Sequence, residues 1–332
     1  MMSRFTTIAL ISVGMLAGST VATAQTPAYG RNQAPICNSA AQAEATNAGA
    51  NDPGSAYPDS AYPGTVNYVE GSVLLDGNPL ARRDVGRATM QPGEVLSTEA
   101  GKAEVLLTPG VFLRLDDNTA VKMVAPDLTH TQVELDKGHA ALEVDQIFPQ
   151  NDLEVTDGGV SVRALKPGFY EFNANQPTAM VFKGEAEVRA DNGRVREIKE
   201  HHQMQLIAGA DVKPAGFNTD DARDGLYNWS SLRSQYLAEA NNQVASEYAG
   251  VSGFAPGWYW EPHMWDYTFI GLGPYWSPFG FGFYPPWGWY GGYWGRGYYG
   301  RGFYGGGYYG SRGFGGAGGG LGGFHGGGGG RR

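Results

Sequence analysis

The feature that most constrains the fold of this chain is the alternating sequence of residues 102–124, KAEVLLTPGVFLRLDDNTAVKMV. Apolar side chains recur at every second position in three short runs, which is the period of a β-strand. One set, with Val105 and Leu113 in it, should lie on a buried face and the other on a wetter face. Pro109-Gly110 suits a type II turn, and Asp116-Asp117-Asn118 can turn through side-chain bonds to the backbone. We expect an antiparallel β-meander here.

The same pattern of short strands and turns extends over residues 66–210. Turn sequences such as Asp76-Gly77 and Pro167-Gly168 separate most of the strands, and Asn192-Gly193 is the strongest hairpin signal. Many short strands at spacings of about 8–12 residues indicate an all-β fold, a multi-stranded antiparallel sandwich, barrel or roll. A domain of about 140 residues is large enough to bury a single hydrophobic core.

The N-terminus has the features of a secretory signal peptide, residues 1–24. Arg4 provides the positive charge, a short apolar segment follows, and Ala22-Thr23-Ala24 fits the small-residue rule for cleavage. We therefore expect cleavage after Ala24, a periplasmic or secreted protein, and no transmembrane span. Residues 25–65 are rich in Ala, Asn, Pro, Gly and Ser, which predicts a flexible linker. This linker contains the single cysteine, Cys37, whose role the sequence leaves open.

Residues 219–247 are predicted to form the one convincing helix of the chain, a short amphipathic helix. Thr219 is a suitable N-cap, and Gly225 weakens the first turn, so the helix can also begin after it. The predicted apolar face follows spacings of three and four and comprises Leu226, Trp229, Leu232, Tyr236 and Ala240. This face either binds a partner or packs on the β domain.

From residue 254 the composition changes to an aromatic, Gly-rich low-complexity tail, residues 254–332, which we expect to be disordered. Its tryptophans offer flat apolar faces with a polar edge, which suits contact with a protein or a glycan. The candidate contact residues are Trp258, Trp260, Trp265, Trp276, Trp287 and Trp289. Self-association or matrix adhesion, glycan contact and the absence of any specific ligand all remain open for this tail.

Charge and motifs argue against several classes of function. The formal net charge is −9, and the body before residue 254 has 19 basic and 31 acidic side chains, which disfavours nucleic-acid binding. The sequence contains no recognised nucleophile, nucleotide-binding or zinc-protease signature. Three groups of polar residues are better explained as surface or turn residues: His130 with His139, Asp116 to Asn118, and Glu261, His263 and Asp266 in the predicted tail. We therefore predict no enzyme activity, no cofactor and no metal site.

Several motifs of the β domain resemble the FecR domain. The segment Gln91-Pro92-Gly93-Glu94-Val95-Leu96-Ser97-Thr98 resembles the G-D-x-I-x-T entry of that family, and residues 103–107 and 111–115 resemble its next two strands. Residues 133–140 resemble its L-x-x-G-x-(A/V) strand pair, and the resemblance covers about residues 66–190. Together with the helix and the aromatic tail, this arrangement is similar to secreted FecR-domain proteins, many of them acidobacterial.

The resemblance implies a periplasmic interaction module. In the best-known members the domain relays the state of an outer-membrane transporter to a sigma factor. Those members also carry a cytoplasmic anti-sigma segment and a membrane helix. We do not expect either in this chain. Our leading hypothesis is a non-enzymatic FecR-like protein of the cell envelope that binds a protein or polysaccharide. The alternatives are a periplasmic sensory partner of a transport or sigma-factor system and, with less support, a glycan-active enzyme that uses Asp116 and Asp117.

Overall fold

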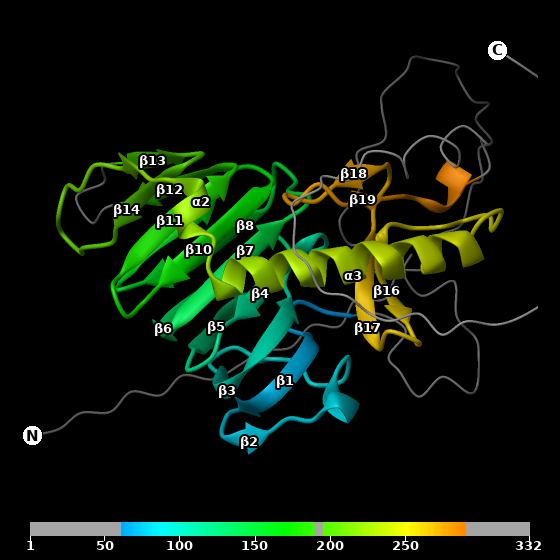
Figure 1. Cartoon of the computed structure of the whole chain (residues 1–332). Coiled ribbons are helices and arrows are strands. Elements are labelled where there is room, and N and C mark those ends of the chain that lie inside the picture. The colour runs from blue at the N-terminus through cyan, green and yellow to red at the C-terminus, as the bar shows by residue number, and fades with distance from the viewer. Residues whose placement is uncertain (1–60, 190–194, 290–332) are drawn as a thin grey trace, which may run out of the picture. The chain divides into compact units, whose positions relative to one another are not determined.

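The structure is a computed structural model that describes residues 61–189 and 195–289. In this part of the chain two layers of β-sheet pack face to face, and the main helix lies over one of them (Figure 1). The predicted all-β fold with one substantial helix is confirmed. The sheet that lies between the other sheet and the helix is called the middle sheet here, and the other is called the outer sheet.

Among the described strands, those of both sheets form one continuous hydrogen-bonded path with one branch. The middle sheet comprises β1 (Val66–Leu75), the end of β3 (Val95–Leu106), β4 (Val111–Leu115), β7 (His139–Val144), β10 (Gly168–Asn173), β11 (Thr178–Lys183) and β14 (His202–Gln205). The outer sheet comprises the beginning of β3, β5 (Ala120–Pro126), β6 (His130–Lys137), β8 (Asp152–Asp157), β9 (Val160–Ala164), β12 (Glu185–Arg189) and β13 (Val195–Lys199). Two-residue strands, β2 (Asn78–Pro79) and β15 (Ala215–Gly216), pair with β1 and β14. Strand β1, with its partner β2, branches from the path at β3.

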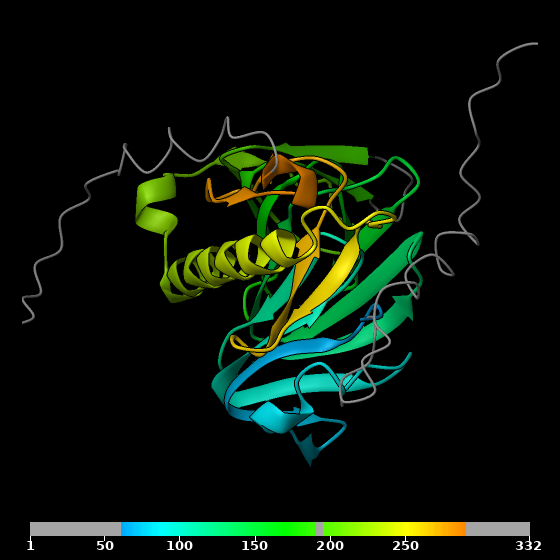
Figure 2. The same cartoon turned by 90° about the vertical axis from the view of Figure 1, so that its right-hand side faces the viewer.

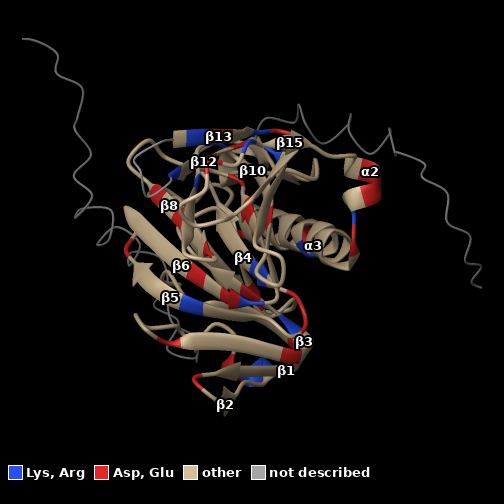
Figure 3. Ribbon diagram, turned by 90° about the vertical axis from the view of Figure 1, so that its left-hand side faces the viewer, with Lys and Arg blue, Asp and Glu red and all other residues tan. Residues whose placement is uncertain are grey.

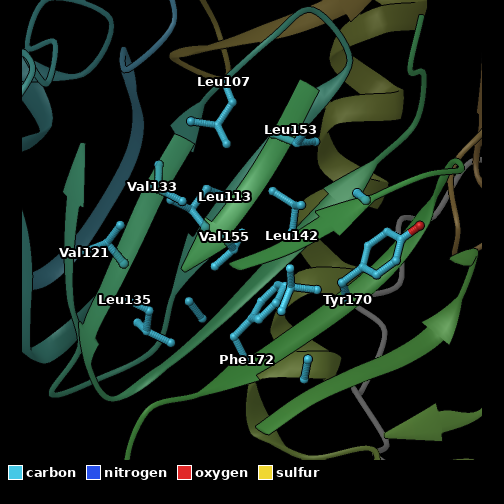
Figure 4. Packing of buried hydrophobic residues seen from close by; sticks show 14 of the residues in the cluster. Leu107, Leu113, Val121, Val133, Leu135, Leu142, Leu153, Val155, Tyr170 and Phe172 are labelled. Carbon is cyan, nitrogen blue, oxygen red and sulfur yellow. The ribbon is translucent and has the colours of Figure 1, made fainter. Parts of the chain in front are cut away.

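Strand β3 joins the two layers because it is long enough to belong to both. Its first residues, 95–97, pair with β5, and its last residues, 103–106, pair with β4. The main hydrophobic core lies between the layers, where Leu113, Leu142 and Tyr170 of the middle sheet face Val133 and Val155 of the outer sheet (Figure 4). Burying this apolar surface between two sheets is the dominant stabilising contribution to such a fold.

The predicted strands of residues 102–124 are present, but their pairing is not that of a meander. Strands β3 and β4 form the expected hairpin, with Gly110 at a φ of 83° in the turn. Strand β4 then pairs with β7, while β5 pairs with β3 and β6. The chain crosses from the middle sheet to the outer sheet between β4 and β5, which local alternation cannot indicate because both strands have the same period.

Two of the predicted turns can be checked directly. Asp76 and Gly77 both have positive φ, 49° and 77°, and connect β1 to β2 as a tight hairpin turn. Asn118 has a φ of 52°, so the 116–118 segment is a turn as predicted. The Asn192-Gly193 turn lies outside the described residues, but β12 and β13 on either side of it pair antiparallel.

The predicted helical region consists of two helices, its N-cap is Asn218 instead of Thr219, and part of its predicted apolar face is exposed. Asn218 caps α2 (Thr219–Ala222), and the side chain of Asp224 accepts a hydrogen bond from Tyr227 N at the start of α3 (Gly225–Glu247). Leu232 and Tyr236, placed on the predicted buried face, are 46% and 44% exposed. The residues buried instead include four polar ones, Ser230, Arg233, Ser234 and Asn241. The prediction of this face is confirmed for Leu226 and Ala240, which are buried, and was wrong for Leu232 and Tyr236, because it followed apolar residues only.

Residues 254–289 correct the prediction of a tail that is disordered from its first residue. They form the hairpin of β16 (Gly257–Glu261) and β17 (Asp266–Ile270), the short pair β18 (Tyr275–Trp276) and β19 (Gly282–Phe283), and the turn η2 (Pro286–Trp289). Together with α3 these elements cover the second face of the middle sheet and are called the C-terminal layer (Figure 2). Aromatic side chains make this possible because they bury a large apolar area per residue.

Other predicted segments lie outside the described residues: the signal peptide, most of the linker with Cys37, and the Gly-rich repeat from residue 290. Among the described residues, no helix combines the length and apolarity needed to cross a membrane.

A close approach of β1 to β3 gives a test of this fold. Gly71 lies at a register shift, and a Cβ atom there would meet the carbonyl oxygen of Ala100 at 2.1 Å. Gly77 has a similar positive φ but no atom within 4 Å of the Cβ position. Gly77→Ala should cost about 1–2 kcal/mol of unfolding free energy from backbone strain alone. We expect Gly71→Ala to cost about 1–3 kcal/mol more, from overpacking, in urea unfolding experiments. Equal losses would contradict the close approach.

Candidate functional site

The second face of the middle sheet is charged and yet buried. Glu104, Arg114 and Glu143 come from three neighbouring strands, β3, β4 and β7, and each is fully buried. Their strand positions alternate with those of the hydrophobic core, so they point away from it. Alternation therefore identified this face correctly, but the wetter surface expected there is absent because the C-terminal layer covers it.

Arg114 holds the three strands together on this face. Its Nε donates to Glu104 Oε2 at 2.8 Å, and its Nη1 donates to Glu143 Oε2. Glu104 and Arg114 are directly opposite in the β3–β4 register, so the sheet itself places them in contact. A buried arginine that pairs with two carboxylates satisfies much of its fork of donors at once.

Helix α3 brings a second arginine to the same carboxylate. Arg233 Nη2 donates to Glu104 Oε1 at 2.9 Å and to Asp266 Oδ2 of β17 at 3.0 Å. The Arg233 guanidinium also lies 4.3 Å from the ring centroid of Tyr68 on β1, a cation–π contact. The set of Glu104, Arg114, Glu143, Arg233 and Asp266 is called the charge network, and it joins the middle sheet to both α3 and β17.

Neutral polar groups add further contacts to the charge network. Asn67 Nδ2 donates to Glu104 Oε1 and to Tyr267 O, both at 3.0 Å, and Asn67 Oδ1 accepts from Tyr267 N at 2.7 Å. Ser234 Oγ donates to Glu143 Oε1 at 2.7 Å. These bonds fix the backbone of β17 beside β1 and supply Glu143 with a partner from the helix.

The charge network shifts the pKa values of its carboxyl groups in opposite directions. Burial alone would raise the pKa of Glu104, but the guanidinium groups of Arg233 and Arg114 together lower it to about 2. Burial raises the pKa of Asp266 to about 6, because its single partner Arg233 is shared with Glu104. Burial, together with the neighbouring Glu143, raises the pKa of Asp145 well above its ordinary value. Glu104 therefore stays ionised at neutral pH, whereas Asp145 favours its protonated form.

Aromatic packing surrounds the charge network and excludes water from it. Trp258 of β16 meets Phe112 of β4 edge to face, with ring centroids 5.2 Å apart, and Phe269 of β17 at 5.5 Å. Leu106 and Leu237 belong to the same hydrophobic cluster. Because Trp258 is buried in this cluster, its ring joins the two layers and is not available to a partner.

The other predicted contact tryptophans fall into three groups. Trp260 and Trp265 pack edge to face at 5.6 Å, and Trp265 Nε1 donates to Arg82 O at 2.9 Å. Trp276 and Trp287 are 52% and 47% exposed, so both could touch a partner, and that contact stays a prediction. The side chain of Trp289 lies outside the described residues.

The polar residues that the sequence grouped are arranged differently in space. His130 pairs with Asp152 at 3.2 Å, while His139 faces carboxylates of other strands, so these two histidines are not a cross-hairpin pair. Asp116 pairs with Lys102, and Asp117 accepts from Asn118 Nδ2, as expected for a turn. Within the described part of the chain, His139, Glu171 and Asp224 place potential metal-ligand atoms within 4.8 Å of one another.

The sequence contained an unused signal for the covered face. Leu106 and Phe112 occupy strand positions assigned to the wetter face, and Phe169 and Phe182 lie on the same face of neighbouring strands. All four are buried under the C-terminal layer. A strand pattern with Phe and Leu on both faces indicates a sheet covered on both sides. The pairing of Arg233 with Glu104, 129 residues apart, had no local signal.

The match of one family model agrees with the resemblance noted in the sequence. The FecR family model, described as FecR protein, matches residues 94–196. Two crystal structures of a proposed anti-sigma factor from Parabacteroides distasonis align at 16% identity with a TM-score of 0.33. The two alignments cover 38% and 39% of this chain. They cover 60% and 62% of the chains in the two crystal structures. No curated protein matches this chain significantly.

Loss of the helix arginine should weaken the docking of the C-terminal layer. Arg233→Met leaves Asp266 without its arginine partner and leaves Glu104 with one arginine partner instead of two. We therefore expect a loss of about 3–5 kcal/mol in unfolding free energy. Arg223→Met is the matched control, because Arg223 forms an exposed pair with Asp220 and should contribute about 0.5 kcal/mol or less. Urea unfolding measures both, and similar values would show that the charge network does not secure the layer.

The pKa of Asp266 predicts how stability changes with pH. Its pKa is about 6 in the folded protein, compared with the ordinary value of 3.8. As the pH falls, the folded protein therefore protonates this carboxylate at a higher pH than the unfolded protein does. Stability from this group is lowest above pH 6 and increases as the pH falls from 6 towards 3.8, by on the order of 2–3 kcal/mol. Asp266→Asn should remove this increase, measured by urea unfolding from pH 4 to pH 8. Glu239→Gln, which removes an exposed carboxylate of α3, should retain it.

Proposed function

We propose that this chain, which carries a FecR domain, is a non-enzymatic regulatory protein of the cell envelope that responds to a partner protein by direct contact. The observation that carries the proposal is the match of the FecR family model to residues 94–196. The matched segment runs from the residue before β3 to the second residue of β13 and therefore contains most strands of both sheets. A sensory partner of a transport or sigma-factor system fits this match better than glycan binding does.

The C-terminal layer supplies a physical means for such a response. It lies outside the matched segment and docks on the middle sheet through the charge network. Charged groups are well solvated when two faces separate, so the layer can undock at a lower cost than an apolar layer of the same area. A partner that prefers one arrangement would shift the population between docked and undocked states.

The proposed location is the periplasm or the exterior, after cleavage behind Ala24, and the proposed partner is an envelope protein. The mixed distribution of acidic and basic residues along the strands in Figure 3 suits protein contacts better than nucleic-acid binding. Trp276 and Trp287 are proposed contact residues because their side chains are accessible. Self-association through the Gly-rich repeat is a further proposal that falls outside the described residues.

The regulatory proposal predicts a change in transcription when the protein is removed. Deleting its gene should alter the transcripts of a restricted set of genes, measured by RNA sequencing, and the wild-type gene should restore them. Complementation with Arg223→Met should also restore them. Arg233→Met should fail at equal protein levels, because the C-terminal layer no longer docks. An unchanged transcript profile, with no envelope protein bound by the purified chain, would refute a regulatory role.

A further inference from the structure

A second polar cluster lies on the covered face of the middle sheet, at the start of α3. It consists of His139 on β7, Glu171 on β10 and Asp224, the N-cap of α3. His139 and Glu171 lie inside the segment matched by the FecR model, and Asp224 lies outside it. The cluster therefore connects the FecR domain to the C-terminal layer at a point separate from the charge network.

Both contacts of His139 in this cluster are longer than a well-formed hydrogen bond. His139 Nε2 lies 3.5 Å from Glu171 Oε2, and His139 Nδ1 lies 3.4 Å from Asp224 Oδ2. Nitrogen–oxygen hydrogen bonds in proteins measure about 2.7–3.2 Å, so both contacts are too long. Ligand atoms around a tetrahedral zinc ion, with bonds of about 2.0–2.1 Å, lie about 3.3 Å apart. The two distances start at different ring nitrogens, so only one of them can be an edge of such a site. One ligand atom from each of the three residues nevertheless lies within 4.8 Å of the other two.

Glu171 gives an independent indication of a missing ligand. Its side chain is buried, it faces His139, and its Oε1 atom has no hydrogen-bond partner. A buried carboxylate oxygen without a partner costs about 1–3 kcal/mol or more, and native proteins rarely leave one unsatisfied. A bound cation would satisfy this atom and neutralise the charge of Glu171.

We propose that His139, Glu171 and Asp224 bind a divalent transition-metal ion of the Zn²⁺ type. One imidazole nitrogen with two carboxylate oxygens is a ligand set that zinc accepts, and a water molecule would complete the tetrahedron. Ligation through Nε2, which faces Glu171, requires the exposed side chain of Asp224 to turn from Nδ1, now 3.4 Å away, to the ion. Nδ1 then faces Asp116 Oδ2, now 4.0 Å away, as the carboxylate that orients the ring. The ion would tie the N-cap residue of α3 to β7 and β10 and so clamp the C-terminal layer to the sheet.

Zinc titration of the full mature chain tests this proposal. Cys37→Ser is the background for every variant, so that the single thiol cannot bind the metal. Asp224→Asn removes a ligand but keeps the helix cap, because Asn and Asp are equally good N-caps. His139→Ala removes the imidazole, and His130→Ala is the matched control, since His130 forms an exposed pair with Asp152.

We expect isothermal titration calorimetry to show one zinc ion per chain for the background protein and for His130→Ala. Binding should be at least about tenfold weaker in His139→Ala and Asp224→Asn. Zinc should also raise the melting temperature of the background protein and of His130→Ala, but not of Asp224→Asn. If the folded background protein binds no zinc, or Asp224→Asn binds it equally well, the proposal is wrong.

Discussion

The pairing of Glu104 with two arginines is the interaction on which the arrangement of this protein depends. Arg114 reaches Glu104 from the next strand and Arg233 reaches it from the helix, so one carboxylate connects the sheet to the layer above it. Buried charges are stable only when their partners are in place. The position of α3 on the middle sheet is therefore specified by ionic partners as well as by apolar contact.

This constraint also explains the composition of the helix. An amphipathic helix normally buries an apolar stripe, but α3 buries Arg233, Ser234 and Asn241 because their partners lie beneath it. Its outward-facing Leu232 and Tyr236 then remain exposed. The aromatic residues of β16 and β17 add to the apolar contact made by Leu237 and Val244 of the helix, so helix and hairpin are two halves of one covering layer.

Local chemistry predicted the elements of this fold better than their pairing. Alternation and turn residues such as Asp76-Gly77 predicted the strands and the all-β class, because these signals act over a few residues. The crossing between β4 and β5 and the pairing of Arg233 with Glu104 depend on contacts distant in sequence, which no local period records. Low-complexity composition misled the assignment of residues 254–289, where the aromatic residues pack instead of remaining free.

The charged second face of the middle sheet has a consequence for biosynthesis. The chain emerges from the ribosome N-terminus first, so the strands through β14 are complete before α3 and β17 exist. At that stage Glu104, Arg114 and Glu143 face water, which solvates them well. An apolar face of the same size would invite association between nascent chains. The charges that later secure the C-terminal layer thus reduce the apolar surface that the half-made protein presents beside Leu106, Phe112, Phe169 and Phe182 until its cover is translated.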